Sequence, residues 1–276
     1  MSDDQRLELA YDIASVYSEL ANVEAVAVAG SQLSGDFDET SDIDLYVYLR
    51  DDLTINMRAV IAQERSSQIE VGNAFWEPGD EWVEDETNID VDVMFRRKQW
   101  IEDQLTQVLD LYNASLGYST SIWYNLRQSK ILFDRHGWLH GLKERAMQPY
   151  PDALQRAIIA KNFPILRNRI SSYYAQLEKA IKRGDLVSIN HRTTALVASY
   201  FDVLFALNRQ PHPGEKRIIV QAELLCQKRP VDMRSQVESL FKYMGEPSDA
   251  LLITAKSLLD GLEYLVRAER LYPVED

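Results

Sequence analysis

The chain has 276 residues, a net charge of −13, and the apolar and aromatic content of an ordinary globular protein. Its charge is uneven, with 23 acidic and 7 basic residues among the first 100, so a nucleic-acid partner, which needs a basic face, is disfavoured. The single cysteine, Cys226, excludes an internal disulfide, and no run of 18 apolar residues exists that could form a transmembrane helix.

The chain begins with a predicted helix and two predicted strands. Apolar residues at helical spacing predict a helix over residues 5–21, and the apolar run Val23–Ala29 predicts a strand. A polar loop then leads into a second strand, Asp42–Leu49. Because alternate residues of a strand share a face, Asp42 and Asp44 point the same way, while the residues between and after them face the core.

Two carboxylates on one face of a strand indicate a metal site. Asp42 and Asp44 lie roughly 6.6 Å apart along the backbone and repel each other unless a cation lies between them. Oxygen ligands without cysteine or histidine favour Mg²⁺. Gly30 and Ser31, at the end of the first strand, offer a close backbone approach and a hydroxyl, both suited to phosphate oxygens. The alternative is a polar hairpin with solvated acidic residues.

A third strand follows a less regular stretch. The elements before it are a helix over residues 53–69, a short apolar piece over 69–75 and a turn-rich acidic segment over 77–88. The run Ile89–Phe95 then alternates strictly, which predicts a strand whose polar face carries Asp90 and Asp92. After it come a helix over 97–112, a helix over 121–127, a final strand over 130–134 and another helix that starts near residue 135.

The character of the chain changes at Pro149-Tyr150-Pro151. A helical pattern over residues 152–183 contains Pro164, which predicts a kink or a break near Phe163. Further helices are expected over 186–208, 215–227, 231–243 and 248–270. We therefore predict an α+β fold, with a small mixed sheet and flanking helices over 1–145 and an α-helical bundle over 150–276.

The stretch from Val26 to Leu49 resembles the signature of the nucleotidyltransferase superfamily, which includes polymerase beta and the antibiotic nucleotidyltransferases. The signature is an apolar strand, Gly-Ser, a spacer of about ten residues and Asp-x-Asp in a strand. Gly30-Ser31, the loop 32–41 and Asp42-Ile43-Asp44 fit it without a gap. Three features at fixed spacing make the pattern fairly specific, whereas a lone Asp-x-Asp would be weak.

Elements further along the chain resemble a bacterial subgroup of this superfamily that has no assigned substrate. They are Asp92-Val-Met-Phe-Arg96, Gly117-Tyr-Ser-Thr120 and Ile131-Leu-Phe-Asp-Arg135. The order of a catalytic domain before a helical bundle is similar to that of the aminoglycoside and lincosamide nucleotidyltransferases. The helical domain would then lie on the acceptor side.

The resemblance implies Mg²⁺-dependent transfer of a nucleoside monophosphate, AMP from ATP, to a hydroxyl of a small molecule such as an antibiotic. The superfamily has a third carboxylate beside Asp-x-Asp, which Asp92 supplies better than Asp90 because it lies deeper in its strand. Asp42, Asp44 and Asp92 are thus the expected catalytic and metal-binding residues. Asp92 would bind a second ion or accept the proton of the attacking hydroxyl.

Other residues are expected to bind the two substrates. Gly30 and Ser31 would hold the phosphates of the donor, and Lys216 and Arg217, at the start of a helix, would reach a phosphate or pyrophosphate. An acidic group before the third strand could hold a cationic acceptor or serve as a base, although acidic surface residues are commonly just solvated. Its members are Glu70, Glu77, Asp80, Glu81 and Glu84.

Two alternatives remain open at this point. One is AMP transfer to a protein hydroxyl, as in toxin–antitoxin systems, and the other is a nucleotide-binding module without turnover, which the intact trio of aspartates disfavours. The acidic N-terminus lacks the apolar core of a signal peptide, so a cytoplasmic protein is expected. Its expected partners are a nucleoside triphosphate and a small-molecule acceptor, without nucleic acid or membrane.

Overall fold

The computed structural model describes residues 3–29, 42–75, 77–245 and 247–273. Contacts within the chain divide it into two compact units, residues 1–105 with 125–148 and residues 106–124 with 149–276. Two of the junctions fall inside helices, α3 (Lys98–Leu109) and α4 (Ser121–Gln128). A catalytic role for residues 1–145 and an acceptor-side role for residues 150–276 stay predictions.

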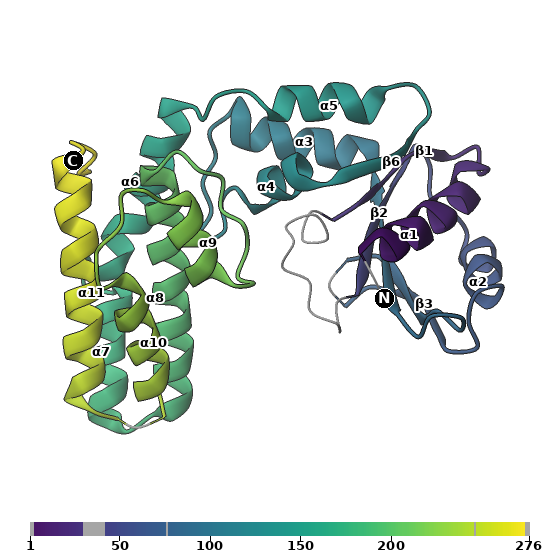
Figure 1. Ribbon diagram of the computed structural model, residues 1–276. Coiled ribbons are helices and arrows are strands. Elements are labelled where there is room, and N and C mark those ends of the chain that lie inside the picture. Colours follow the sequence, from purple (N-terminus) through teal and green to yellow (C-terminus); the bar gives the residue numbers. More distant parts are fainter. Residues whose placement is uncertain (1–2, 30–41, 76, 246, 274–276) are drawn as a thin grey trace. The chain divides into compact units, whose positions relative to one another are not determined.

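The first unit contains a mixed sheet of six strands among its described residues (Figure 1). The strands are β1 (Val23–Val28), β2 (Ile43–Leu49), β3 (Ile69–Asn73), β4 (Gly79–Val83), β5 (Asp90–Arg97) and β6 (Lys130–Asp134). Their order is β3-β4-β5-β2-β1-β6, and β2 and β5 are parallel while the other neighbours are antiparallel. The predicted mixed sheet with flanking helices is therefore confirmed.

One face of the sheet is apolar and packs on α1 (Asp3–Ser18) and α2 (Ile55–Gln63). Ile43 and Leu45 of β2, like Val91 and Val93 of β5, are at most 1% exposed in this core. The alternation in the sequence dictates this arrangement, because a strand sends successive side chains to opposite faces. The opposite face of β2 therefore carries Asp44.

A tryptophan covers the far end of that opposite face. Trp138 begins α5 (Trp138–Ala146) and packs edge to face on Tyr48 of β2, with ring centroids 5.5 Å apart. Its indole N–H donates to Oε1 of Glu102 in α3 at 2.6 Å. The polar face is thus closed by aromatic packing near the end of β2, while Asp44 near its start stays only half-buried.

The prediction of a turn-rich acidic segment over residues 77–88 is wrong in its middle, where Gly79–Val83 forms β4. The sequence pattern did not indicate this strand, because Asp80 occupies a core position where an apolar residue is expected. Its side chain is 0% exposed. Arg58 of α2 donates to both Asp80 carboxylate oxygens, from Nε at 2.9 Å and from Nη2, and the backbone N–H of Gly72 donates to Oδ1 at 2.8 Å. A buried ion pair therefore replaces the apolar residue that the pattern would need.

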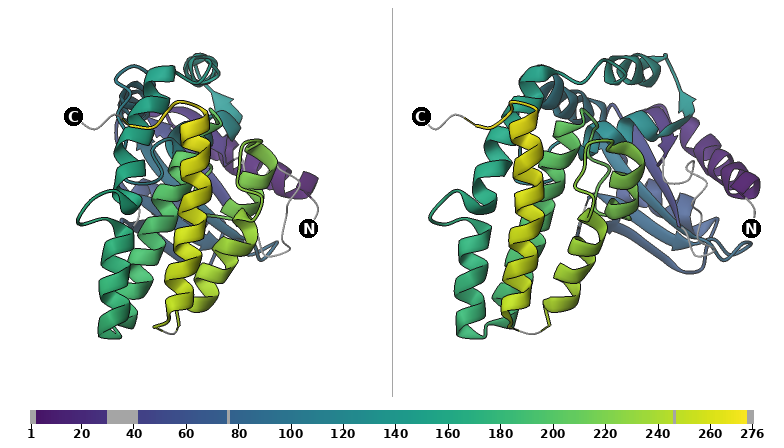
Figure 2. Two further views of the ribbon diagram at one scale, coloured as in Figure 1. Left: turned by 90° about the vertical axis from the view of Figure 1, so that its left-hand side faces the viewer. Right: turned by 60° about the vertical axis from the view of Figure 1, so that its left-hand side comes forward.

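The second unit is helical, as predicted. Its main helices are α6 (Asp152–Arg167), α7 (Tyr173–Arg183), α8 (Leu186–Leu207), α9 (Ile218–Leu225), α10 (Met233–Tyr243) and α11 (Asp249–Ala268). Figure 2 shows α11, in yellow, running alongside α7 and α8. The second half of α8 is buried without interruption from Ser199 to Leu207, which makes this helix the centre of the bundle. Among the described helices, none combines the length and apolar character needed to cross a membrane.

Pro164 does not break its helix at the expected place. Helix α6 continues through Pro164 to Arg167, and the chain leaves helical conformation only over residues 168–172. Ser172 then caps α7, because its Oγ accepts a hydrogen bond from the N–H of Ala175 at 3.3 Å. The break therefore lies between the end of α6 at Arg167 and the Ser172 cap, after the proline rather than before it. Helices α2 and α9 are also shorter than predicted.

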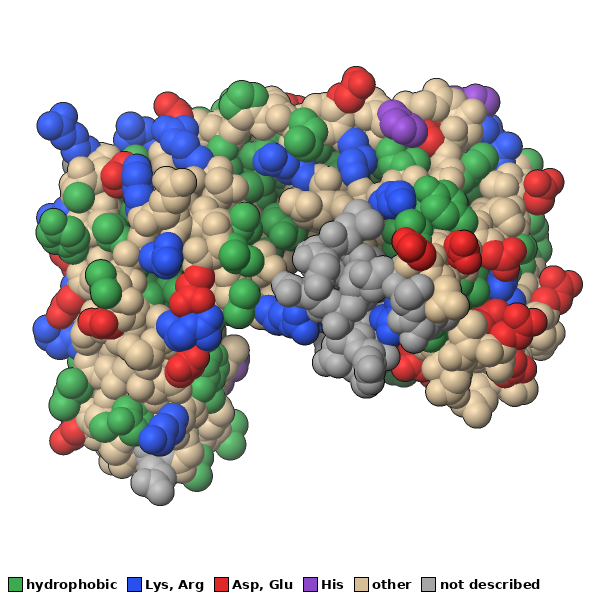
Figure 3. Space-filling view, in the orientation of Figure 1, with side chains coloured by type: hydrophobic (Ala, Val, Ile, Leu, Met, Phe, Trp, Pro, Cys, Tyr) green, Lys and Arg blue, Asp and Glu red, His purple; other side chains and the backbone are tan. Residues whose placement is uncertain are grey.

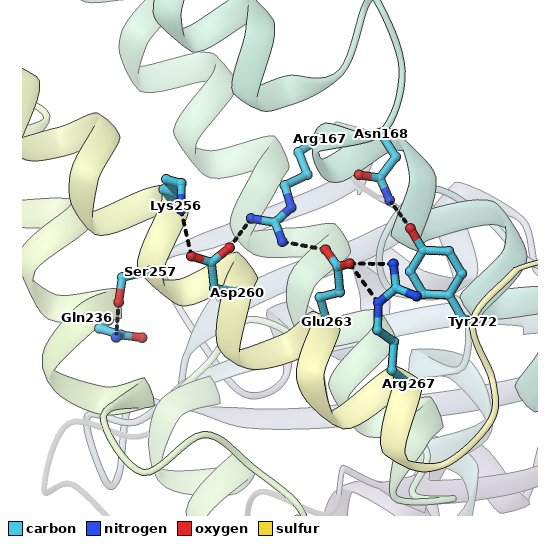
Figure 4. Close-up of polar contacts among 9 residues, drawn as sticks. All are labelled: Arg167, Asn168, Gln236, Lys256, Ser257, Asp260, Glu263, Arg267 and Tyr272. Atoms are coloured by element: carbon cyan, nitrogen blue, oxygen red, sulfur yellow. Dashed lines mark hydrogen bonds and ion pairs between the residues drawn. The ribbon is translucent and has the colours of Figure 1, made fainter.

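An arginine joins α6 to α11 (Figure 4). Arg167 donates to Asp260 and to Glu263, and Glu263 also accepts from Nε of Arg267 at 2.8 Å. The hydrogen bond from Arg167 lowers the pKa of Asp260. The Arg267 guanidinium in turn lies 3.7 Å from the ring centroid of Tyr272, so the network also fastens the segment that follows α11.

A buried carboxylate organises the chain before α4. Asp202 of α8 accepts hydrogen bonds from the N–H of Ser119 at 3.0 Å, from its Oγ at 2.5 Å and from Nδ2 of Asn162 at 3.0 Å. These contacts hold a turn in which Gly117 and Tyr118 both have positive φ, 77° and 56°. Burial raises the pKa of Asp202 to about 7, although the hydrogen bonds from Ser119 oppose the rise.

Replacing Arg167 should weaken the helical unit. In Arg167→Met, Asp260 and Glu263 lose their shared partner. We expect the free energy of unfolding to fall by about 1–2 kcal/mol. The loss is no larger because the Asp260 side chain is half exposed and water screens its charge. Urea unfolding followed by circular dichroism measures this. Lys182→Met removes an exposed ion pair to Glu178 on α7 and serves as the control. Equal losses in the two variants would contradict a special role for the Arg167 network.

Asp202 should give the protein a pH-dependent stability. Its folded pKa, about 7, lies above the ordinary value of 3.8, so the folded state holds this proton more tightly than the unfolded state. The protonated carboxyl therefore adds to the free energy of unfolding, on the order of 2–4 kcal/mol. This contribution is complete below about pH 4 and is lost as the pH rises to about 7. Urea unfolding at pH 4 to 8 should therefore show a decline relative to Asp202→Asn. Parallel pH profiles of the two proteins would refute this.

Candidate active site

Two parallel strands bring three acidic residues together. Asp44 in β2 and Asp92 in β5 are paired in register, so both side chains project from the same face. Asp42 lies two residues before Asp44, directly ahead of β2. One oxygen from each of the three carboxylates lies within 4.8 Å of the others. The sequence thus placed the three residues in one group, whereas the alternative Asp90 is exposed at the start of β5.

The register of β2 and β5 fixes Asp44 and Asp92 on the polar face of the sheet. A register shift of one residue would turn Asp44 or Asp92 into the apolar core and expel a buried residue such as Val93. Desolvation by burial raises the pKa of Asp92 to about 6, helped by repulsion from Asp44 and Glu81 and more weakly from other nearby acids. Three half-buried carboxylates so close together are an all-oxygen donor set that fits Mg²⁺.

The acidic group continues across the sheet as a row of carboxylates. Glu70 of β3 is paired with Glu81 of β4, Glu81 with Asp92, and Asp92 with Asp44. Neighbouring strands are about 4.8 Å apart, so the row spans roughly 14 Å on one face. Like charges directly opposite one another are unfavourable for folding. The row is therefore a feature that folding alone does not favour.

The structure divides the five acidic residues expected to hold a cationic substrate. Three of them have structural partners: Asp80 pairs with Arg58, Glu84 with Arg65 and Glu77 with Arg96. Only Glu70 and Glu81 align with the aspartate group, and both are exposed. The sequence missed this alignment because it depends on β4, the strand that the pattern did not reveal. Further acidic side chains are visible over α1 and α2, which cover the other face of the sheet (Figure 3).

Four further residues were predicted to bind phosphate groups. Gly30 and Ser31 lie outside the described residues. Lys216 and Arg217 are exposed in the second unit, where Arg217 has a φ of 51° and directly precedes α9. A phosphate-binding role for these four residues stays a prediction.

Two family models match parts of the chain. Residues 11–75, which include Asp42 and Asp44, match the model described as Polymerase beta, Nucleotidyltransferase. Residues 119–217 match a domain of unknown function, DUF4037, a range that includes β6 and α5 of the first unit and α6, α7 and α8 of the second. No curated protein matches the chain.

The solved structures that are similar to the chain include two at low identity. A nucleotidyltransferase-like protein from Exiguobacterium sibiricum 255-15 is 15% identical, with 96% of this chain and 76% of that one covered and a TM-score of 0.44. Spectinomycin adenyltransferase AAD(9) from Enterococcus faecialis, solved with ATP and spectinomycin, is 12% identical, with 94% and 98% covered and a TM-score of 0.32. Both are too distant to bear on the chemistry of this chain.

The family-model match lies on the segment that carries the strand, the loop and the Asp-x-Asp motif. It agrees with the mixed sheet in which that motif lies beside a third aspartate. The chain resembles the nucleotidyltransferase superfamily, as its sequence motif predicts.

Proposed function

We propose that this protein transfers a nucleoside monophosphate, AMP from ATP, to a hydroxyl of a small molecule and releases pyrophosphate. The observation that carries the proposal is the group Asp42, Asp44 and Asp92, whose carboxylate oxygens lie within 4.8 Å of one another. The segment that contains the first two residues matches a nucleotidyltransferase model, which supports nucleotidyl transfer as the reaction class.

The chemistry is a displacement at the α-phosphorus. The acceptor oxygen forms a bond to phosphorus while the bond to the pyrophosphate oxygen breaks, and the hydroxyl proton leaves with a base. Mg²⁺, when bound, would neutralise charge on the triphosphate and the leaving group. Asp42 and Asp44 would hold the ion. Gly30, Ser31, Lys216 and Arg217 are our candidates for holding the phosphates.

Asp92 is the candidate with two roles. Its pKa of about 6 makes its carboxylate a better proton acceptor than an ordinary aspartate, which suits a general base for the attacking hydroxyl. Its oxygen is also close enough to those of Asp42 and Asp44 to share metal binding with them. Both roles require the ionised form of Asp92, which a cation bound by the group would favour.

The row of carboxylates favours a cationic acceptor. Glu81 and Glu70 continue the line of Asp44 and Asp92 to the edge of the sheet, and neither glutamate has an arginine or lysine partner among the described residues. Glu81 accepts one hydrogen bond, from Nδ2 of Asn73 at 2.8 Å, which orients its carboxylate. An acceptor with two amino groups about 5 Å apart would match adjacent carboxylates of the row. An amine-bearing antibiotic is one such molecule.

Donor binding should depend on the aspartates and on magnesium. ATP with Mg²⁺ should raise the thermal unfolding midpoint. A ligand at 100 times its dissociation constant adds about 2.7 kcal/mol to the free energy of unfolding. Each kcal/mol raises the midpoint by roughly 2–4 °C for a protein of this size. The shift should be lost without Mg²⁺ and in Asp44→Asn, and parallel scans with CTP, GTP and UTP identify the donor. Asp90→Asn, which removes an exposed acid two residues from Asp92, is the matched control. A full shift in Asp44→Asn would refute the proposed site.

Acceptor binding should depend on Glu81. In a pyrophosphate-release assay with ATP and a panel of amine-bearing hydroxyl compounds, Glu81→Gln should raise the KM of the acceptor about fivefold, the effect of one exposed charge contact. The thermal shift with ATP should stay unchanged, because Glu81 is outside the aspartate group. An unchanged KM for the acceptor would remove Glu81 from the acceptor site.

A further inference from the structure

A second cleft lies at the other end of the two parallel strands. It encloses about 720 Å³, a size typical of sites for small molecules. Its lining includes Leu49, the last residue of β2, and Phe95 near the end of β5. Asp44 and Leu49 are five residues apart in β2, so roughly 16 Å separates the cleft from the aspartate group. The proposed nucleotidyl transfer does not use this cleft.

Three guanidinium groups converge on the cleft. Arg58, Arg96 and Arg97 all line it, and each is held by one carboxylate through Nε and Nη2. Arg96 donates to Glu77 at 2.7 Å from both nitrogens. This side-on fork is the geometry in which arginine binds the carboxylate or phosphate of a ligand. The cleft thus contains three guanidinium groups, each oriented by a carboxylate partner.

Two helices also begin at the cleft. The residue after Arg97 starts α3, and Leu53, another lining residue, precedes Thr54, the N-cap of α2. Helix N-termini carry a positive partial charge, which favours anions. In open parallel α/β sheets, ligand sites usually lie at the carboxyl ends of the strands, and the parallel pair β2 and β5 ends at this cleft. Charge and topology therefore both point to an anionic ligand.

The three carboxylate partners differ in how firmly they are fixed. Asp80, the partner of Arg58, is fully buried and cannot leave. Asp52, the partner of Arg97, has a side chain that is 70% exposed, and that of Arg97 is 53% exposed. Exposed ion pairs contribute little to stability. An incoming anion can therefore replace Asp52 on Arg97 while Asp52 returns to water.

Apart from the arginines and their partners Asp52 and Glu77, the lining is apolar or aromatic. The Arg58 guanidinium lies 4.1 Å from the Phe95 ring centroid, and the Arg96 guanidinium lies 5.2 Å from that of Trp100. Flat groups stacked in this way offer flat surfaces to a ligand. A molecule with a planar apolar body and one anionic group would match both parts of the lining.

We propose that this cleft is a second binding site, for a small molecule that carries a carboxylate or a phosphate on a flat apolar body. In the absence of ligand, the Asp52 carboxylate occupies the place of the anionic group on Arg97. Removing the charge of Asp52 should therefore strengthen the binding of an anionic ligand to Arg97. If Asp52 instead bound a cationic ligand directly, the same change would weaken binding.

Isothermal titration calorimetry with phenyl phosphate and benzoate tests the proposal. The buffer contains EDTA, so that divalent ions do not recruit phosphate to the aspartate group. We expect at least one of the two probes to bind, about three- to tenfold more tightly in Asp52→Asn and at least tenfold more weakly in Arg97→Gln. The probe with the higher affinity identifies the anionic group of the ligand.

Two controls separate this site from a general effect of charge. Asp90→Asn removes an exposed carboxylate elsewhere in the same unit and should leave the affinity unchanged, as should Asp44→Asn in the aspartate group. Benzylamine has the same ring with a cation and should not bind. The proposal is overturned if benzylamine binds in place of the anions, if Asp90→Asn has the same effect as Asp52→Asn, or if neither anion binds to wild type or Asp52→Asn at millimolar concentration.

Discussion

The parallel pairing of β2 with β5 is the constraint on which both ends of the first unit depend. At one end it places Asp44 beside Asp92, and at the other it leads two strands into the N-termini of α2 and α3. Two charges about 5 Å apart repel by roughly 3 kcal/mol at an effective dielectric constant of 20. Burial of Ile43, Leu45, Val91 and Val93 contributes about 1.5–3 kcal/mol each, so the apolar face outweighs the repulsion.

The two units use buried carboxylates in different ways. In the first, Asp80 forms an ion pair with Arg58 that fixes α2 to β4. In the second, Asp202 meets only uncharged hydrogen-bond donors and holds the strained turn at Gly117 and Tyr118. Burial without a cationic partner raises the pKa of Asp202, and the hydrogen bonds that it accepts from Ser119 only partly oppose that rise.

Much of this molecule could be predicted from its sequence because the decisive patterns are local. Strict alternation indicated β5, and the spacing of Gly-Ser and Asp-x-Asp carried the resemblance that implied a third carboxylate, Asp92, beside Asp42 and Asp44. The features that were missed depend on side chains far apart in the sequence. Strand β4 needs the pair Arg58–Asp80, separated by 22 residues, and the cleft needs Arg97–Asp52, separated by 45. A local sequence pattern does not predict pairs between residues so far apart.

The buried pair between Arg58 and Asp80 constrains how this chain can evolve. Loss of one partner leaves an uncompensated charge in the core, which costs about 3–5 kcal/mol, whereas replacing both by apolar residues of similar volume is nearly neutral. Single-step substitution at either position therefore passes through a poorly folded intermediate. In homologous chains that share this sheet, the two positions should change together or remain an arginine and an aspartate.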